Sequence, residues 1–156
     1  MRLGRLGRVV DQYPHGWDYA WLAVDAAGHV AVFTNAGAGP IPAAVLADRK
    51  NADRAAELIE ELPERGGCQM LIALPRPDDF VAFARRGLFA YDWRDVHRTT
   101  EWTHRYELLA RPEAPVSVGE LPADVAALAC RARFATVRFA ENPSVAVAEH
   151  VECSPP

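Results

Sequence analysis

The sequence predicts an α+β fold in which a largely antiparallel sheet packs against about four helices. Three observations predict this class: two apolar runs joined by a turn, amphipathic helical segments among later strands, and no internal repeat or domain linker. Half of the 156 residues are hydrophobic, which is enough for one domain with an ordinary core. We expect residues 1–156 to form this single domain, with residues 1–12 and 152–156 as loose termini.

A buried β-hairpin over residues 18–35 is the clearest predicted element. Residues 19–24 and 30–33 are apolar at successive positions, which is typical of strands covered on both faces. Between them, residues 25–28 contain an Asp that can start a turn and a Gly that can adopt positive φ.

Helical and strand patterns alternate along the middle of the chain. Pro42 and Pro77 each occupy a favourable first position of a predicted helix. The expected elements are, in order, helices over 42–48 and 51–62, a strand over 69–74, a helix over 77–87, and strands over 88–93 and 103–110. We expect the last two strands to pair antiparallel.

The last third of the sequence predicts a helix followed by a second hairpin. Pro122 opens the helix, whose inward stripe comprises Val125, Leu128, Ala129 and Ala132. Residues 133–139 and 144–151 have strand patterns joined by a predicted turn over 140–143, and residues 153–156 are expected to be a loose tail.

Charge and cysteine content predict which classes of partner are excluded and in which cellular compartment the protein resides. Acidic residues outnumber basic ones by 21 to 17, so no overall positive field attracts nucleic acid. No apolar run approaches the roughly 18–20 residues of a membrane span. The first ten residues lack the apolar core of an export signal, and the three cysteines form no close pair. These features predict a cytoplasmic protein that binds neither nucleic acid nor membrane.

The sequence contains no complete set of catalytic or cofactor-binding residues. None of its serines lies in a nucleophile elbow, and Cys68 is interpreted as a small buried hydrophobe. His97 and His104 would need further ligands to hold a metal, so we expect His104 to pack in the sheet and His97 to lie on a solvated loop. The sequence predicts no metal and no cofactor, and it favours a protein that is not an enzyme.

One segment, residues 91–102, has a composition typical of protein-binding surfaces. It combines Trp, Tyr and Arg, which are enriched at interface hot spots, with acidic residues and one His. Core aromatics beside an ordinary charged hairpin are the alternative interpretation. The residues predicted to contact a partner are Asp92, Trp93, Arg94, Asp95, His97, Arg98, Glu101 and Trp102.

Three stretches of sequence carry a resemblance to known proteins. Residues 21–42, 87–93 and 106–112 resemble a group of small uncharacterised bacterial proteins. That group is similar in size, acidity and α+β character to the immunity proteins that accompany bacterial polymorphic toxins. The resemblance implies inhibition of a toxin by direct binding, and it supplies no catalytic residues.

The leading hypothesis is therefore a non-catalytic protein-binding domain, specifically an immunity protein that neutralises a cognate bacterial toxin. The alternative is a small enzyme or ligand-binding protein with a pocket near residues 18–42. A deep pocket lined by Trp21, His29, Cys68 and an acid with a shifted pKa would favour that alternative. A structural subunit is a third possibility, and both a monomer and a homodimer are compatible with the sequence.

Overall fold

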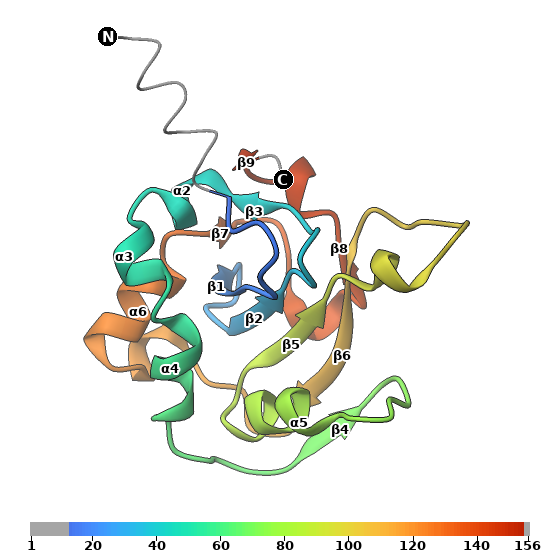
Figure 1. Ribbon diagram of the computed structural model, residues 1–156. Helices are drawn as coiled ribbons and strands as arrows, with labels where there is room; N and C mark the ends of the chain where they lie inside the picture. The colour runs from blue at the N-terminus through green and yellow to red at the C-terminus, as the bar shows by residue number, and fades with distance from the viewer. Residues whose placement is uncertain (1–12, 155–156) are drawn as a thin grey trace, which may run out of the picture.

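The computed structural model describes residues 13–154, and the predicted hairpin lies at the centre of its main sheet (Figure 1). Strands β1 (Ala20–Asp25) and β2 (Val30–Thr34) pair antiparallel. Their turn is held by Asp25, whose Oδ1 accepts hydrogen bonds from the amides of Ala27 and His29, each at 2.9 Å. The prediction for residues 1–12 and for residues 155–156 falls outside the described part of the chain.

The main sheet extends on both sides of the hairpin and mixes strand directions. Its order is β4-β6-β5-β2-β1-β7, and β8 also pairs with β6. The pairs β2·β5 and β1·β7 are parallel and the other described pairs of this sheet are antiparallel, including the predicted β5·β6 pair. The added strands are β4 (Cys68–Met70), β5 (Phe89–Asp92), β6 (Tyr106–Pro112), β7 (Arg133–Phe134) and β8 (Ser144–Val145). The α+β class is confirmed.

The helices are shorter than the sequence pattern predicts. They are α2 (Ala43–Leu46), α3 (Arg49–Ala52), α4 (Ala55–Glu60), α5 (Asp78–Arg85) and α6 (Ala123–Ala129). The helix predicted over 51–62 is broken around residue 53, yet its stripe of Ala55, Leu58, Ile59 and Leu62 is buried as expected. No helix within residues 13–154 has the length and apolarity to cross a bilayer.

Both faces of the central strands are covered by hydrophobic layers. On one face, Leu22 and Val32 pack in a cluster that includes buried residues of α4, α5 and α6. On the other face, an aromatic cluster is centred on Phe33, whose ring stacks on Trp21 at 4.3 Å and on Tyr91 at 4.9 Å. The prediction of strands apolar on both sides is thus confirmed.

The predicted C-terminal hairpin over 133–139 and 144–151 is wrong. β7 runs parallel to β1 and β8 pairs with β6, so the two segments do not pair with each other. Side chains from the sheet bind the backbone that such a hairpin would use. Asp25 Oδ2 accepts the Phe139 amide at 2.7 Å, and the Tyr91 hydroxyl donates to the Asn142 carbonyl at 2.6 Å.

The described end of the chain is also ordered, contrary to the predicted loose tail. Strand β9 (Cys153–Ser154) pairs antiparallel with β3 (Ile41–Pro42), and the Ala43 amide donates to the Glu152 carbonyl. Pro42 therefore belongs to a short strand, and α2 begins one residue later than expected.

We expect Asp25→Ala to lower the free energy of unfolding by about 2–4 kcal/mol, because it leaves backbone amides of the hairpin turn and of the C-terminal third without their acceptor. Urea denaturation followed by fluorescence measures this change. Glu64→Ala, at an exposed loop position, is the control. Equal stabilities of the two variants would contradict the role given to Asp25.

Candidate functional site

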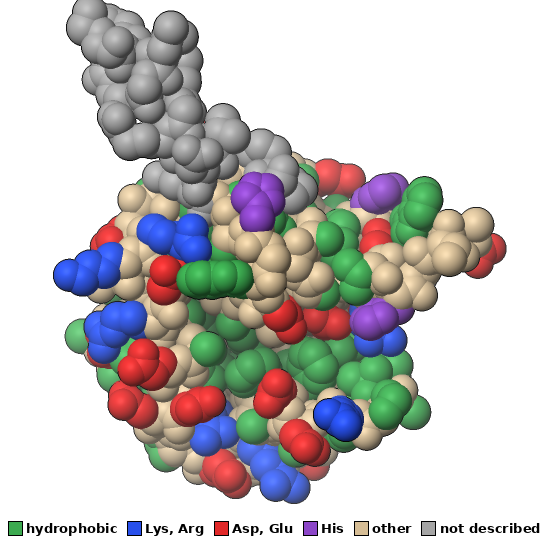
Figure 2. Space-filling view, viewed as in Figure 1, with side chains coloured by type: hydrophobic (Ala, Val, Ile, Leu, Met, Phe, Trp, Pro, Cys, Tyr) green, Lys and Arg blue, Asp and Glu red, His purple; other side chains and the backbone are tan. Residues whose placement is uncertain are grey.

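An open cleft of about 670 Å³ lies where strands β2 and β5 end. These strands are parallel neighbours, so their carboxyl ends meet at one edge of the sheet, and the antiparallel β1 begins at the same edge. In open α/β sheets, ligands bind beyond the carboxyl ends of parallel strands, and β2 and β5 end here in that arrangement. Figure 2 shows the hollow, with hydrophobic side chains on its floor and acidic side chains along its upper rim.

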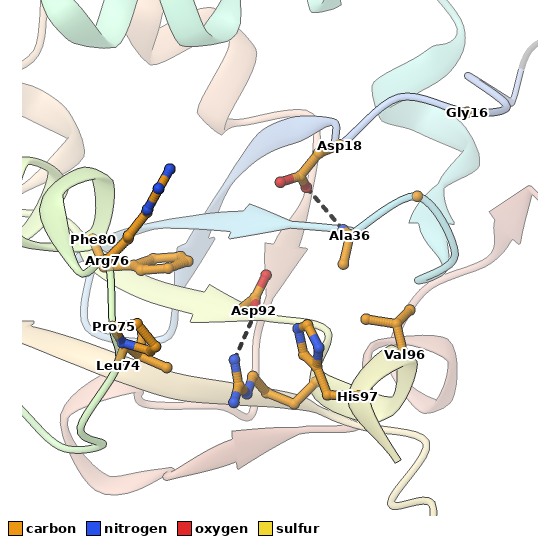
Figure 3. A pocket seen from close by; sticks show the side chains of 12 residues that line it. Gly16, Asp18, Ala36, Leu74, Pro75, Arg76, Phe80, Asp92, Val96 and His97 are labelled. Atoms are coloured by element: carbon orange, nitrogen blue, oxygen red, sulfur yellow. Dashed lines mark hydrogen bonds and ion pairs between the residues drawn. The ribbon is translucent and has the colours of Figure 1, made fainter. Parts of the chain in front are cut away.

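The two walls of the cleft come from different parts of the chain (Figure 3). One wall follows the strand ends and includes Asp18, Ala36, Asp92 and the 3₁₀ turn Arg94–His97. The opposite wall supplies Leu74, Pro75 and Arg76 from the segment between β4 and α5, and Phe80 from the first turn of α5. Carboxylates on the strand-end wall therefore lie across the opening from a wall that carries Arg76 among apolar side chains.

Asp92 is the most unusual side chain of the cleft. It is only 6% exposed, and its Oδ1 accepts a hydrogen bond of 2.5 Å from the Thr34 hydroxyl. Its Oδ2 lies 4.0 Å from Arg94 Nη1, too far for a hydrogen bond. Burial raises the pKa of this carboxyl and the negative charge of Asp18 adds to the rise, although the Thr34 hydrogen bond and the charges of Arg94 and His97 oppose it. The ionised form is thus poorly compensated in the folded protein.

Asp18 and the rim beside it are fixed by buried Asn35. Asn35 Oδ1 accepts the amides of Tyr19 at 2.6 Å and Gly37 at 3.0 Å, which ties the start of β1 to the loop after β2. Asp18 Oδ1 in turn accepts the Ala36 amide at 2.9 Å. Ala36 and Gly37 have φ of 50° and 78°, a left-handed conformation that this network holds in place.

The 93–105 loop, which connects β5 to β6, extends beyond the strands (Figure 1) and is anchored by buried Asp95. Asp95 accepts the backbone amides of Thr103 at 2.9 Å and His104 at 2.7 Å, and also the Arg98 guanidinium at 3.0 Å. Arg98 makes a bidentate pair with Glu107 on β6, at 2.5 and 2.9 Å. Burial raises the Asp95 pKa, but the hydrogen bonds from Thr103, His104 and Arg98 outweigh it and hold that pKa below its usual value.

Two hydrophobic side chains of this loop face solvent. Trp102 is 54% exposed and Val96 is 45% exposed. The Trp102 indole Nε1 donates to the Arg98 carbonyl at 2.9 Å, so the ring is held by the anchored part of the loop. The ring borders a shallow depression that is also lined by Ala38, Trp93, Asp95, Val96 and His104.

The structure brings the residues predicted to contact a partner into one loop but gives them different roles. Asp92, Trp93 and Asp95 are buried, because their side chains complete the core or accept hydrogen bonds there. Arg94 and His97 line the cleft, Arg98 is committed to its ion pairs, and Glu101 and Trp102 are exposed. His97 is exposed as expected, but the prediction that His104 packs in the sheet is wrong. Its side chain is 78% exposed and its φ is 55°.

Three of the residues named for the alternative pocket, Trp21, His29 and Cys68, do not line the cleft, and Trp21 is fully buried. The cleft does border the expected segment 18–42, through Asp18, Ala36 and Gly37, and it contains an acid with a raised pKa, Asp92.

The sequence pattern did not single out Asp18, Thr34 or Arg76 as site residues. A usable signal was present for Thr34, because it is a polar residue directly after the apolar run 30–33. Residues 13–154 contain no cluster of three or more His, Cys, Asp or Glu side chains arranged to hold a metal ion.

Comparison of the chain with protein-family models, with curated proteins and with solved structures gives no match.

We expect Asp92→Asn to raise the free energy of unfolding at pH 7 by about 0.5–2 kcal/mol, since it removes an undercompensated buried charge. A raised pKa means that this carboxyl stabilises the fold when protonated and loses that contribution as pH rises through its folded-state pKa. The advantage of the variant should therefore shrink as pH falls toward the ordinary Asp pKa of about 3.9. Thermal denaturation between pH 3.5 and 7 measures this advantage, and a less stable variant at pH 7 would show that the Asp92 charge is compensated in the folded protein.

Asp95→Ala should have the opposite effect, lowering the free energy of unfolding by about 2–4 kcal/mol. The amides of Thr103 and His104 lose their acceptor, so hydrogen exchange should accelerate over the 93–105 loop. Exchange in the central β1–β2 hairpin reports the change in global stability, so protection of the loop is compared with protection of the hairpin. Unchanged protection of the loop would show that Asp95 does not anchor it.

Proposed function

We propose that this chain is a non-catalytic protein-binding domain, an immunity protein that neutralises a cognate bacterial toxin by direct binding. The observation that carries the proposal is the position of Trp102. Its ring is more than half exposed, yet it is attached to a loop that is anchored by a buried carboxylate and a bidentate ion pair.

A fixed, exposed aromatic side chain favours a protein partner. Trp contributes a large contact area, and it is among the residue types that dominate interface energetics. Association is less costly when the binding loop is already ordered, because less conformational freedom is lost. The shallow depression beside Trp102 suits a side chain of the partner better than a small molecule that must be enclosed.

The charge of the chain favours a basic partner. The net charge is −4, and the exposed tip of the loop adds Glu101 beside Trp102. Complementary charge accelerates encounter with a positively charged surface, an effect that weakens as salt screens it. We place the interaction in the cytoplasm, and the support for this is that Cys68, Cys130 and Cys153 are free thiols.

The proposal is tested with the protein encoded next to this gene, purified in an inactivated form and titrated by isothermal calorimetry. We expect Trp102→Ala to weaken the complex by about 30-fold or more, the loss typical of a hot-spot residue. Trp17→Ala is the matched control, because Trp17 is 53% exposed and lies outside the loop.

Equal effects of the two variants, or no complex with the neighbouring protein, would contradict the proposal. Light scattering adds a separate readout. A homodimer that dissociates in Trp102→Ala would assign this surface to self-association instead.

A further inference from the structure

The cleft has features that binding through Trp102 does not use. Its charged lining is balanced, with Asp18 and Asp92 set against Arg76 and Arg94. In Figure 3 the carboxylates of Asp18 and Asp92 lie on the strand-end wall, whereas Arg76 comes from the opposite wall. A ligand with both a positive and a negative group would match this separation of charge.

We propose that the cleft binds a small zwitterion, an α-amino acid with an apolar side chain. Its ammonium group would lie between Asp18 and Asp92, its carboxylate would face Arg76, and its side chain would contact Leu74 and Phe80.

The ammonium position rests on the environment of Asp92. This carboxylate is nine-tenths buried, and its Oδ2 accepts no hydrogen bond from any described residue. A buried carboxylate with an unused acceptor is costly, and an N–H donor of opposite charge supplies what it lacks. Asp18 and Asp92 line the same cleft, and the negative charge of Asp18 contributes to raising the Asp92 pKa. A cation between them would relieve that repulsion.

The carboxylate position rests on the difference between the two arginines. Arg94 is directed to Asp92, with Nη1 at 4.0 Å from Oδ2. Arg76 forms no hydrogen bond or ion pair with another described residue, so its guanidinium is available. Guanidinium groups bind carboxylates through two parallel N–H donors.

The cleft also offers a hydrophobic surface that the apolar side chain of the ligand can contact. Leu74 and Phe80 are partly buried residues of the wall that also carries Arg76. The cleft volume of about 670 Å³ lies within the range of small-molecule sites, so an aromatic amino acid fits with room for water.

Three probes of matched shape test the proposal by ligand-observed NMR and calorimetry. Phenylalanine carries both charges, phenylalaninamide carries only the ammonium and resembles a peptide N-terminus, and 3-phenylpropanoate carries only the carboxylate. We expect phenylalanine to bind at least tenfold more tightly than either of the others. Equal binding of phenylalaninamide would overturn the zwitterion in favour of a peptide N-terminus, and tighter binding of 3-phenylpropanoate, or no binding of any probe, would overturn the site.

Two substitutions test which residue binds each charged group of the ligand. Asp92→Asn should weaken phenylalanine at least tenfold and leave 3-phenylpropanoate unchanged, whereas Arg76→Gln should weaken both probes that carry a carboxylate. Asp92→Asn is expected to fold, since it removes a buried charge, and Glu64→Gln outside the cleft is the control. If phenylalanine binds Asp92→Asn as it binds the unaltered protein, the proposal is wrong.

The outcome is separable from that of the proposed function. Trp102 does not line the cleft, so Trp102→Ala should leave the affinity for phenylalanine within twofold of its original value. Loss of phenylalanine binding in that variant would count against a distinct site.

Discussion

The burial of strands β1, β2 and β5 on both faces is the constraint on which the rest of the structure depends. Helices pack on one side and an aromatic cluster on the other, so the interior of these strands has no room for groups that need water or a ligand. Polar side chains are tolerated only where the strands end, because hydrogen-bond partners and solvent are available there. Thr34, Asn35 and Asp92 all lie at one such edge, and the cleft opens beside them.

Two buried carboxylates three residues apart illustrate opposite uses of this edge. Asp95 accepts backbone amides and a guanidinium, so its charge is satisfied and it orders the 93–105 loop. Asp92 has one strong hydrogen bond, and its second oxygen lies 4.0 Å from Arg94 Nη1 and accepts no hydrogen bond from a described residue. The first arrangement stabilises the fold. The second costs stability, which is characteristic of sites shaped for binding.

The local sequence pattern was sufficient to predict those elements whose structure is determined by residues close together in the sequence. The turn chemistry of Asp25 and Gly28, and the apolar stripe that includes Val125 and Leu128, identified the central hairpin and α6. The C-terminal third could not be predicted in this way. Its backbone is bound by Asp25 and Tyr91, which lie far away in sequence, and those bonds override the strand propensity of residues 133–151. Composition likewise indicated that the 91–102 segment binds a partner, but it could not tell which of its side chains are buried. Aromatic and acidic residues are typical of interfaces, yet in this segment Trp93, Asp92 and Asp95 are buried within the fold.

The cleft and the loop share a wall, and this limits how independently they can act. Val96 borders both the cleft and the depression beside Trp102, and it belongs to the 3₁₀ turn that also carries Arg94 and His97. A ligand in the cleft and a partner on the loop would thus touch the same turn, and any effect of one on the affinity of the other must be reciprocal. The bonds of Asp95 hold the backbone around this turn, which opposes a change in its shape. Coupling between the two surfaces would therefore pass through direct contact at Val96. Each bound molecule would raise the affinity for the other if the two pack together there, and would lower it if they collide.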